Sequence, residues 1–160
     1  MNKLIVYDST YGNTEKIATA IGRSIDAKVR HINDFKFSEL DNLNLLILGS
    51  PVHGGRPTFE MQQFLETFPK NSLKGIGVAA FDTRFAPEDH GLGLKILMAV
   101  INFAAPRMLK ILVAKGGIEI IPGEGFIVID KEGPIKKGEK DRAGKWARRV
   151  EMRLKTILNT

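Results

Sequence analysis

Six consecutive polar or turn-forming residues near the N-terminus have the composition of a phosphate-binding loop. The segment Ser9-Thr10-Tyr11-Gly12-Asn13-Thr14 offers hydroxyl and amide groups between an apolar run and a segment with helical spacing. Backbone N–H groups at a helix N-terminus, together with the positive end of the helix dipole, stabilise a phosphate dianion. The same residue types are also ordinary turn and cap formers, which is the alternative interpretation of this segment.

The donors of this loop are neutral. It contains no lysine or arginine and lacks the Gly-Lys-Ser/Thr ending of loops that bind a triphosphate. Neutral donors suit the terminal phosphate of a bound cofactor better than a triphosphate that is cleaved with the help of a metal. The chain also has no cysteine, which excludes disulfides, thiolate nucleophiles and iron–sulfur ligation. Any redox chemistry must therefore use a bound organic cofactor.

Other catalytic classes find no matching pattern. The histidines are His31, His53 and His90, and none occurs in the spacing of a metal-binding motif. A Gly-x-Ser-x-Gly nucleophile turn is absent as well. We expect neither a metal site nor a Ser–His–Asp hydrolase.

The polar loop needs a strand before it and a helix after it, and the hydrophobic spacing predicts both. Residues 4–7 are an apolar β-favouring run, and Ile17, Ile21 and Ile25 recur at helical spacing. The other predicted strands lie at residues 28–32, 45–48, 75–81 and, in two pieces, 118–121 and 126–129. Two further helices are predicted to begin near Pro57 and near Glu139. Another predicted helix covers residues 92–115, with a break at Ala105-Pro106 and a C-cap at Gly116-Gly117.

Five strands alternating with helices predict an α/β doubly wound sheet of right-handed β-α-β units, in a single domain over residues 1–160. In such sheets, ligands bind beyond the carboxyl ends of the strands. The loops at residues 8–14, 49–56 and 82–90 are therefore the expected ligand-binding segments.

Residues 5–21, Ile-Val-Tyr-Asp-Ser-Thr-Tyr-Gly-Asn-Thr-Glu-Lys-Ile-Ala-Thr-Ala-Ile, resemble the flavodoxin signature at every position that it specifies. Residues 48–55, Leu-Gly-Ser-Pro-Val-His-Gly-Gly, resemble the second flavin-contacting loop of that family, and residues 80–85 occupy the place of the third. The resemblance implies a flavodoxin-like five-stranded parallel sheet of order 2-1-3-4-5 with helices on both faces.

The resemblance also implies FMN as the cofactor. Its phosphate would be bound by Ser9, Thr10, Tyr11, Gly12, Asn13 and Thr14. The isoalloxazine ring would lie between a second segment, Ser50, Pro51, Val52, His53, Gly54 and Gly55, and a third, Asp82, Thr83, Arg84 and Phe85.

Two positions in the second segment leave alternatives open. His53 stands where many flavodoxins carry an aromatic side chain. It would stack on the flavin or hydrogen-bond to it and make the reduction potential pH-dependent, or it is a solvated loop residue. Gly54 and Gly55 either allow a peptide to reorient beside the flavin or form a plain turn.

The third segment has alternatives of its own. Phe85, or else Phe81, is the aromatic residue available to the ring. Arg84 places positive charge beside the reduced flavin, binds an acidic partner, or pairs with one of the nearby acids Asp82, Glu88 and Asp89.

Electron transfer between redox partner proteins is the function that the resemblance implies. One alternative is a small FMN-dependent oxidoreductase that acts on NAD(P)H and a quinone or similar acceptor. Another is a phosphate-binding or interaction module without a redox role. A receiver domain does not fit, because no acidic phosphorylation pocket with its partner lysine is found near Asp8 and Asp82.

The net charge of +6 belongs to one end of the chain. Residues 131–160 hold ten basic and four acidic residues, and the first 130 residues hold fourteen of each. On the predicted last helix, the basic residues lie opposite the apolar ones, and no aromatic residue is interleaved to stack on bases. We expect no specific nucleic-acid binding, and we expect redox partners that differ from those of acidic flavodoxins.

The chain shows no pattern for membrane insertion or export. The N-terminus turns polar too soon for a signal peptide, and no uninterrupted apolar span of about 20 residues is present. We expect a cytoplasmic protein. The stretch 91–115 is longer and more apolar than a crossover helix requires, so it is either buried or an association surface for a homo-oligomer.

Overall fold

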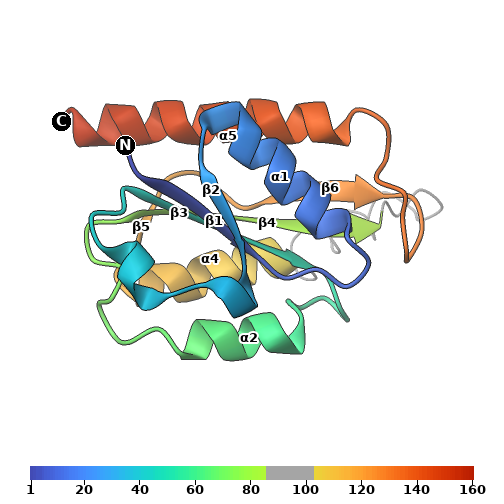
Figure 1. Ribbon diagram of the computed structural model, residues 1–160, viewed down its shortest axis with the longest axis horizontal. Coiled ribbons are helices and arrows are strands. Elements are labelled where there is room, and N and C mark those ends of the chain that lie inside the picture. The colour runs from blue at the N-terminus through green and yellow to red at the C-terminus, as the bar shows by residue number, and fades with distance from the viewer. Residues whose placement is uncertain (86–102) are drawn as a thin grey trace, which may run out of the picture.

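The computed structural model describes residues 1–85 and 103–160. Its parallel sheet has the order β2-β1-β3-β4-β5, with β6 also paired to β4, and helices cover both faces (Figure 1). The strands are β1 (Lys3–Tyr7), β2 (Lys28–His31), β3 (Leu45–Pro51), β4 (Gly77–Phe85), β5 (Ile118–Glu119) and β6 (Glu124–Val128). The helices are α1 (Asn13–Ile25), α2 (Phe59–Glu66), α4 (Ala104–Ala114) and α5 (Glu139–Leu158), with 3-10 turns at Ile32–Asp34 and Phe37–Leu40. The predicted fold class and strand order are confirmed.

The apolar runs of the central strands divide their side chains between two cores. On β1, Leu4 and Val6 pack on one face of the sheet, whereas Ile5 and Tyr7 pack on the other. Successive side chains of a strand point to opposite faces, so an uninterrupted apolar run is what a strand covered on both faces requires.

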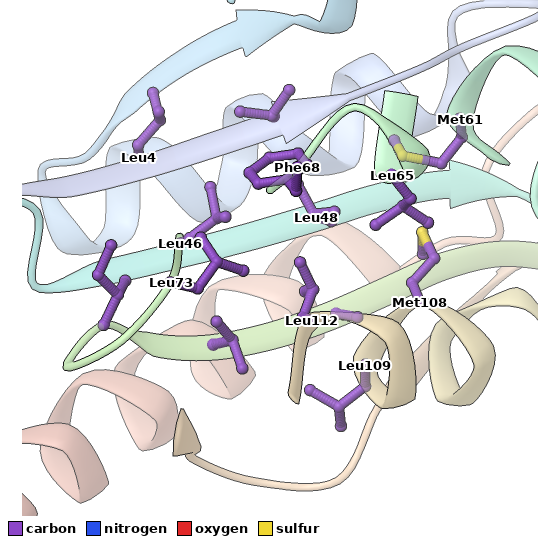
Figure 2. Packing of buried hydrophobic residues seen from close by; sticks show 14 of the residues in the cluster. Leu4, Leu46, Leu48, Met61, Leu65, Phe68, Leu73, Met108, Leu109 and Leu112 are labelled. Atoms are coloured by element: carbon purple, nitrogen blue, oxygen red, sulfur yellow. The ribbon is translucent and has the colours of Figure 1, made fainter. Parts of the chain in front are cut away.

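Each core is closed by a pair of helices. On one face, Met61 and Leu65 of α2 and Met108 and Leu112 of α4 pack against the leucines of β1 and β3 (Figure 2). On the other face, α1 and α5 lie together (Figure 1), and Trp146 of α5 packs edge-on against aromatic rings of β4 and β6. The sheet is thereby held with its strand ends, and not its faces, open to a ligand.

The last strand position is shared by two segments, as the sequence predicted. Gly77 and Val78 at the start of β4 pair with β5, and residues 81–85 at its end pair with β6. The break between β5 and β6 contains Pro122 and Gly123.

The predicted end of β4 was wrong. The sequence placed the strand at residues 75–81 and a loop from Asp82, but β4 continues to Phe85. Asp82 and Thr83 are paired with both β3 and β6, and Arg84 and Phe85 are paired with β6. Similarly, β3 continues through Pro51. Aspartate is generally depleted in strands, but here the carboxylate of Asp82 has partners that offset part of the cost of its burial, described below.

The predicted helix break at Ala105-Pro106 was also wrong, since α4 begins at Ala104 and contains Pro106 in its first turn. Proline is tolerated there because the first-turn N–H groups have no intrahelical acceptor. The predicted C-cap is confirmed by the positive φ of Gly116, 101°. Ala104, Ala105, Met108, Leu109 and Leu112 are buried in the chain's own core. The rest of the predicted 92–115 helix, residues 92–102, lies outside the described residues.

The basic residues of α5 follow the predicted pattern. Ala143, Trp146, Ala147, Val150 and Leu154 are buried, and the side exposed to solvent carries Lys140, Lys145, Arg148, Arg149, Arg153 and Lys155. Arg142 differs from this group. It is half-buried, pairs with Glu139 at 2.8 Å and with Glu124 at 3.2 Å, and lies over the ring of Phe126.

Glu139 links α5 to the sheet and is a source of acid sensitivity. Its carboxylate accepts the backbone N–H of Ile127 at 2.7 Å and the guanidinium of Arg142 at 2.8 Å. Burial opposes its ionisation, but the bonds from Arg142 and Ile127 outweigh burial and lower the pKa of Glu139 below its usual 4.5. A carboxyl whose pKa is lower in the folded state contributes stability above the unfolded pKa and loses it as the pH falls through the folded pKa.

We therefore expect Glu139→Gln to cost about 1 kcal/mol of stability at pH 7 and to flatten the loss of stability between pH 5 and pH 3. Urea unfolding of both proteins at pH 7, 5, 4 and 3 measures this. Parallel curves for the wild type and the variant across that range would contradict the assignment.

Candidate functional site

The polar loop after β1 presents backbone N–H groups at the start of α1. Gly12 is the N-cap residue of α1, with φ 89° and ψ −3°, and within the described residues no side chain caps this end of the helix. The N–H of Gly12 donates to Ser9 Oγ at 3.0 Å, which holds the loop in a tight turn. The N–H groups of the first helical turn thus remain available to an anion.

A cavity of about 770 Å³ opens beside this loop. Thirteen of the sixteen predicted site residues line it: Ser9, Thr10, Tyr11, Asn13, Thr14, Pro51, Val52, His53, Gly54, Gly55, Thr83, Arg84 and Phe85. Three segments that are far apart in the sequence therefore meet at one end of the sheet.

The other three predicted residues, Gly12, Ser50 and Asp82, do not line the cavity. Gly12 shapes the turn into α1 through its left-handed backbone. Ser50 is buried, accepts the N–H of Thr58 at 3.1 Å and donates to the carbonyl of Pro51 at 2.9 Å. Asp82 is also buried and binds Arg84, which does line the cavity.

The second segment ends in a two-residue turn. His53 and Arg56 exchange backbone hydrogen bonds of 2.8 and 3.1 Å, and Gly54 and Gly55 between them have φ 56° and φ 75°. Positive φ at both central positions defines a type I′ turn, which glycine adopts without steric cost. His53 Nε2 lies 3.3 Å from Thr10 Oγ1, so the second segment is hydrogen-bonded to the first.

Asp82 fixes the third segment through hydrogen bonds of its buried carboxylate. Its carboxylate is fully buried and accepts two hydrogen bonds from Arg84, at 2.6 and 2.8 Å. It also accepts the N–H of Ala105 at 2.8 Å, at the start of α4. Burial raises the pKa of Asp82 above its usual 3.8, against the opposing effect of Arg84 and the α4 N–H groups. Of the alternatives for Arg84, the pair with Asp82 is formed.

Arg84 is held on its other side by an aromatic ring. Its guanidinium carbon lies 3.4 Å from the ring centroid of Phe103, which also lines the cavity. A second contact joins this strand to the first loop, since the buried hydroxyls of Thr83 and Thr14 lie 2.8 Å apart. The cavity wall formed by β4 is therefore rigidly connected to both α1 and α4.

The first loop rests on a buried carboxylate that sequence reasoning did not assign to the site. Asp8 accepts the N–H of Ser9 at 2.9 Å and the hydroxyl of Thr58, and His31 Nε2 lies 3.3 Å from it. The Thr58 hydroxyl in turn accepts the N–H of Met61 and caps α2. Asp8 thereby joins the loop to β2 and to the start of α2.

Phe103, Val128 and Lys131 also line the cavity and were not predicted. Phe103 falls within the predicted helix 92–115, and Lys131 falls within the basic stretch 131–160. The last strand ends at the same edge of the sheet as the others, so the strand-end rule applied to it would have indicated Val128 and Lys131.

Two classes of feature are absent from residues 1–85 and 103–160. No group of three histidine or acidic side chains is arranged to hold a metal ion there. None of the helices in these residues has the length and apolar character to cross a membrane. Glu88, Asp89 and His90, which were considered above, lie outside the described residues.

The whole architecture is similar to that of solved flavodoxins. A flavodoxin from the domain Archaea matches with 21% identity and a TM-score of 0.68, over 97% of this chain and 99% of that chain. Oxidised flavodoxin 2 from Bacillus cereus matches with 22% identity and a TM-score of 0.69, over 95% and 99%. Rubredoxin oxygen:oxidoreductase from Desulfovibrio gigas matches with 16% identity and a TM-score of 0.73, over 99% of this chain but 37% of its own.

At these identities the structural likeness concerns the fold. None of the curated proteins compared with this sequence matches it. A family model described as a flavodoxin domain does match, over residues 4–91, which is more than half of the chain and includes all three predicted segments. On the sequence match, the sheet order and the arrangement of these segments, the chain belongs to the flavodoxin family.

Proposed function

We propose that this protein binds FMN and carries electrons between redox partner proteins. The observation that supports this best is the meeting of the uncapped N-terminus of α1 with a cavity of about 770 Å³. A helix end without a side-chain cap, flanked by the hydroxyls of Ser9, Thr10 and Thr14, has the donors that a terminal phosphate requires.

The remaining walls suit a flat aromatic ring system. Tyr11 and Phe85 line the cavity and are 44% and 49% exposed, so aromatic surface is available beside it. Pro51, Val52 and the turn at Gly54 and Gly55 form another part of the wall. Ligand sites of this kind combine apolar walls with a few fixed polar groups.

In this proposal, residues 9–14 would hold the phosphate, and the ring would lie between residues 50–55 and 82–85. When bound, FMN supplies the redox chemistry, and the protein supplies orientation and electrostatics. Arg84 brings a guanidinium to the cavity, and Asp82 and Phe103 hold it in place. Because Asp82 offsets its charge, Arg84 tunes the cavity through a fixed dipole more than through net charge.

We further propose a cytoplasmic location and partners that differ from those of acidic flavodoxins. The support for the partners is the row of exposed basic residues along α5, which accounts for most of the excess charge. Such a surface favours an acidic partner and predicts that association weakens with salt. Self-association through residues 91–115 stays a proposal, and the described part of that stretch buries its apolar side within the chain.

The visible spectrum of the purified protein tests the cofactor. We expect flavin absorbance as isolated, or binding of added FMN with quenching of its fluorescence. Steady-state assays with NAD(P)H and a quinone then test the carrier role, since a pure electron carrier supports NAD(P)H oxidation only when a reductase is added. A colourless protein that binds no FMN would contradict the proposal, and turnover without a reductase would favour the oxidoreductase alternative.

A further inference from the structure

The segment that follows β6 forms a short hairpin with a defined tip. Val128 and Ile135 form an antiparallel bridge, and the N–H of Ile129 donates to the carbonyl of Pro134 at 2.9 Å. At the tip, the N–H of Lys131 donates to the Asp130 carboxylate at 2.7 Å. The backbone of Lys131 is therefore held in place, although its side chain is exposed.

This hairpin lies against the start of α1. A Cβ atom added at Gly133 would come within 2.8 Å of Asn13 Oδ1, so the backbone of Gly133 lies directly against the Asn13 side chain. Figure 1 shows the loop after β6 and the N-terminal end of α1 at the same end of the sheet. Lys131 lines the same cavity as Ser9, Asn13 and Thr14.

Among the described lining residues of the cavity, Arg84 and Lys131 carry cationic side chains. The two differ in whether a carboxylate pairs with them. Arg84 donates two hydrogen bonds to Asp82 and stacks on Phe103. Lys131 has no carboxylate within salt-bridge distance among residues 1–85 and 103–160. Of these two cationic groups, the ammonium group of Lys131 is therefore the one that is available to an anion bound in the cavity.

We propose that the ammonium group of Lys131 pairs with the terminal phosphate of the bound flavin. This inference rests on the proposed function and changes one part of it, because the phosphate is then held by a cation from the far end of the chain as well as by neutral donors. A phosphomonoester carries nearly two charges at pH 7, and the helix end supplies only about half a positive charge. Lys131 therefore favours FMN over riboflavin, which has no phosphate.

The test compares FMN and riboflavin binding by the wild type, Lys131→Ala and Lys137→Ala. Lys137 lies in the same segment between β6 and α5, is exposed and does not line the cavity. Lys137→Ala therefore changes the net charge by the same amount as Lys131→Ala. We expect Lys131→Ala to weaken FMN binding about fivefold to tenfold at low salt, with riboflavin binding changed less than twofold. The loss should shrink at high salt, because an exposed pair is screened.

The outcomes separate the two claims. A wild type that binds neither flavin overturns the proposed function and this inference together. If the wild type binds FMN and the two lysine variants both bind it equally weakly, or both bind it as tightly as the wild type, only the role of Lys131 is overturned. Equal losses of FMN and riboflavin affinity in Lys131→Ala also overturn it, because they would place the effect on the ring or on the loop. Rescue of FMN binding by Lys131→Arg supports the charge pair.

Discussion

Replacing Asp82 by alanine should lower the free energy of unfolding by about 3 kcal/mol, at the low end of the range for breaking a buried ion pair. The substitution leaves two N–H groups of Arg84 and the N–H of Ala105 without their acceptor. The Arg84 side chain is only 17% exposed, so water replaces the carboxylate incompletely. Urea unfolding followed by far-UV circular dichroism measures the change.

Two further variants identify the cause. Lys155→Ala removes an ion pair whose lysine is 56% exposed, and it should cost less than about 1 kcal/mol. Arg84→Ala leaves Asp82 buried with its pKa raised further, so this variant should lose more stability at pH 7 than at pH 5. An Asp82→Ala effect as small as that of Lys155→Ala would show that the pair contributes little to folding.

Gly12→Ala should weaken FMN binding by at least tenfold and cost about 1–2 kcal/mol of stability. Gly12 has φ 89°, a conformation that L-residues rarely adopt, and a Cβ there meets no described atom within 4 Å. The strain therefore arises in the backbone and not from a clash. Relaxing it moves the N–H groups that begin α1, which the proposal assigns to the phosphate. Equilibrium titration with FMN and urea unfolding give the two values.

Gly138 is a matched control for this change. It is the N-cap residue of α5, with φ 88° and ψ −13°, and a Cβ at this position also meets no described atom within 4 Å. Gly138→Ala should therefore cost a similar amount of stability without altering FMN affinity. If both variants lose affinity to the same extent, the effect follows from general destabilisation and not from the geometry of the phosphate loop.

The order of the elements could be predicted because local pattern and tertiary role agree in this chain. The apolar run Leu45–Leu48 is continuous, as a strand buried on both faces must be. The isoleucines of α1 recur at helical spacing because one stripe of that helix faces the sheet. The three site segments were found for a related reason, since they follow strands that end at the same edge.

The ends of the strands and the supporting contacts were not predictable in this way. Asp82 reads as a loop residue because its partners come from distant parts of the fold, namely β3, β6 and the start of α4. Phe103 reaches the cavity through packing that no local period reveals. Asp8 looks like an ordinary turn residue until the positions of His31 and Thr58 are known.

The residues around the cavity and the buried residues of the two apolar cores are separate sets. Val52 lines the cavity and packs against one core, but it is only partly buried, so both cores close mainly without contributions from the site. The polypeptide is therefore expected to keep its fold when the cofactor is removed and to accept it again without refolding. A ligand at 100 times its dissociation constant would then add about 2.7 kcal/mol by mass action alone. Reconstitution with flavin analogues becomes a practical way to change the redox chemistry while the protein stays the same.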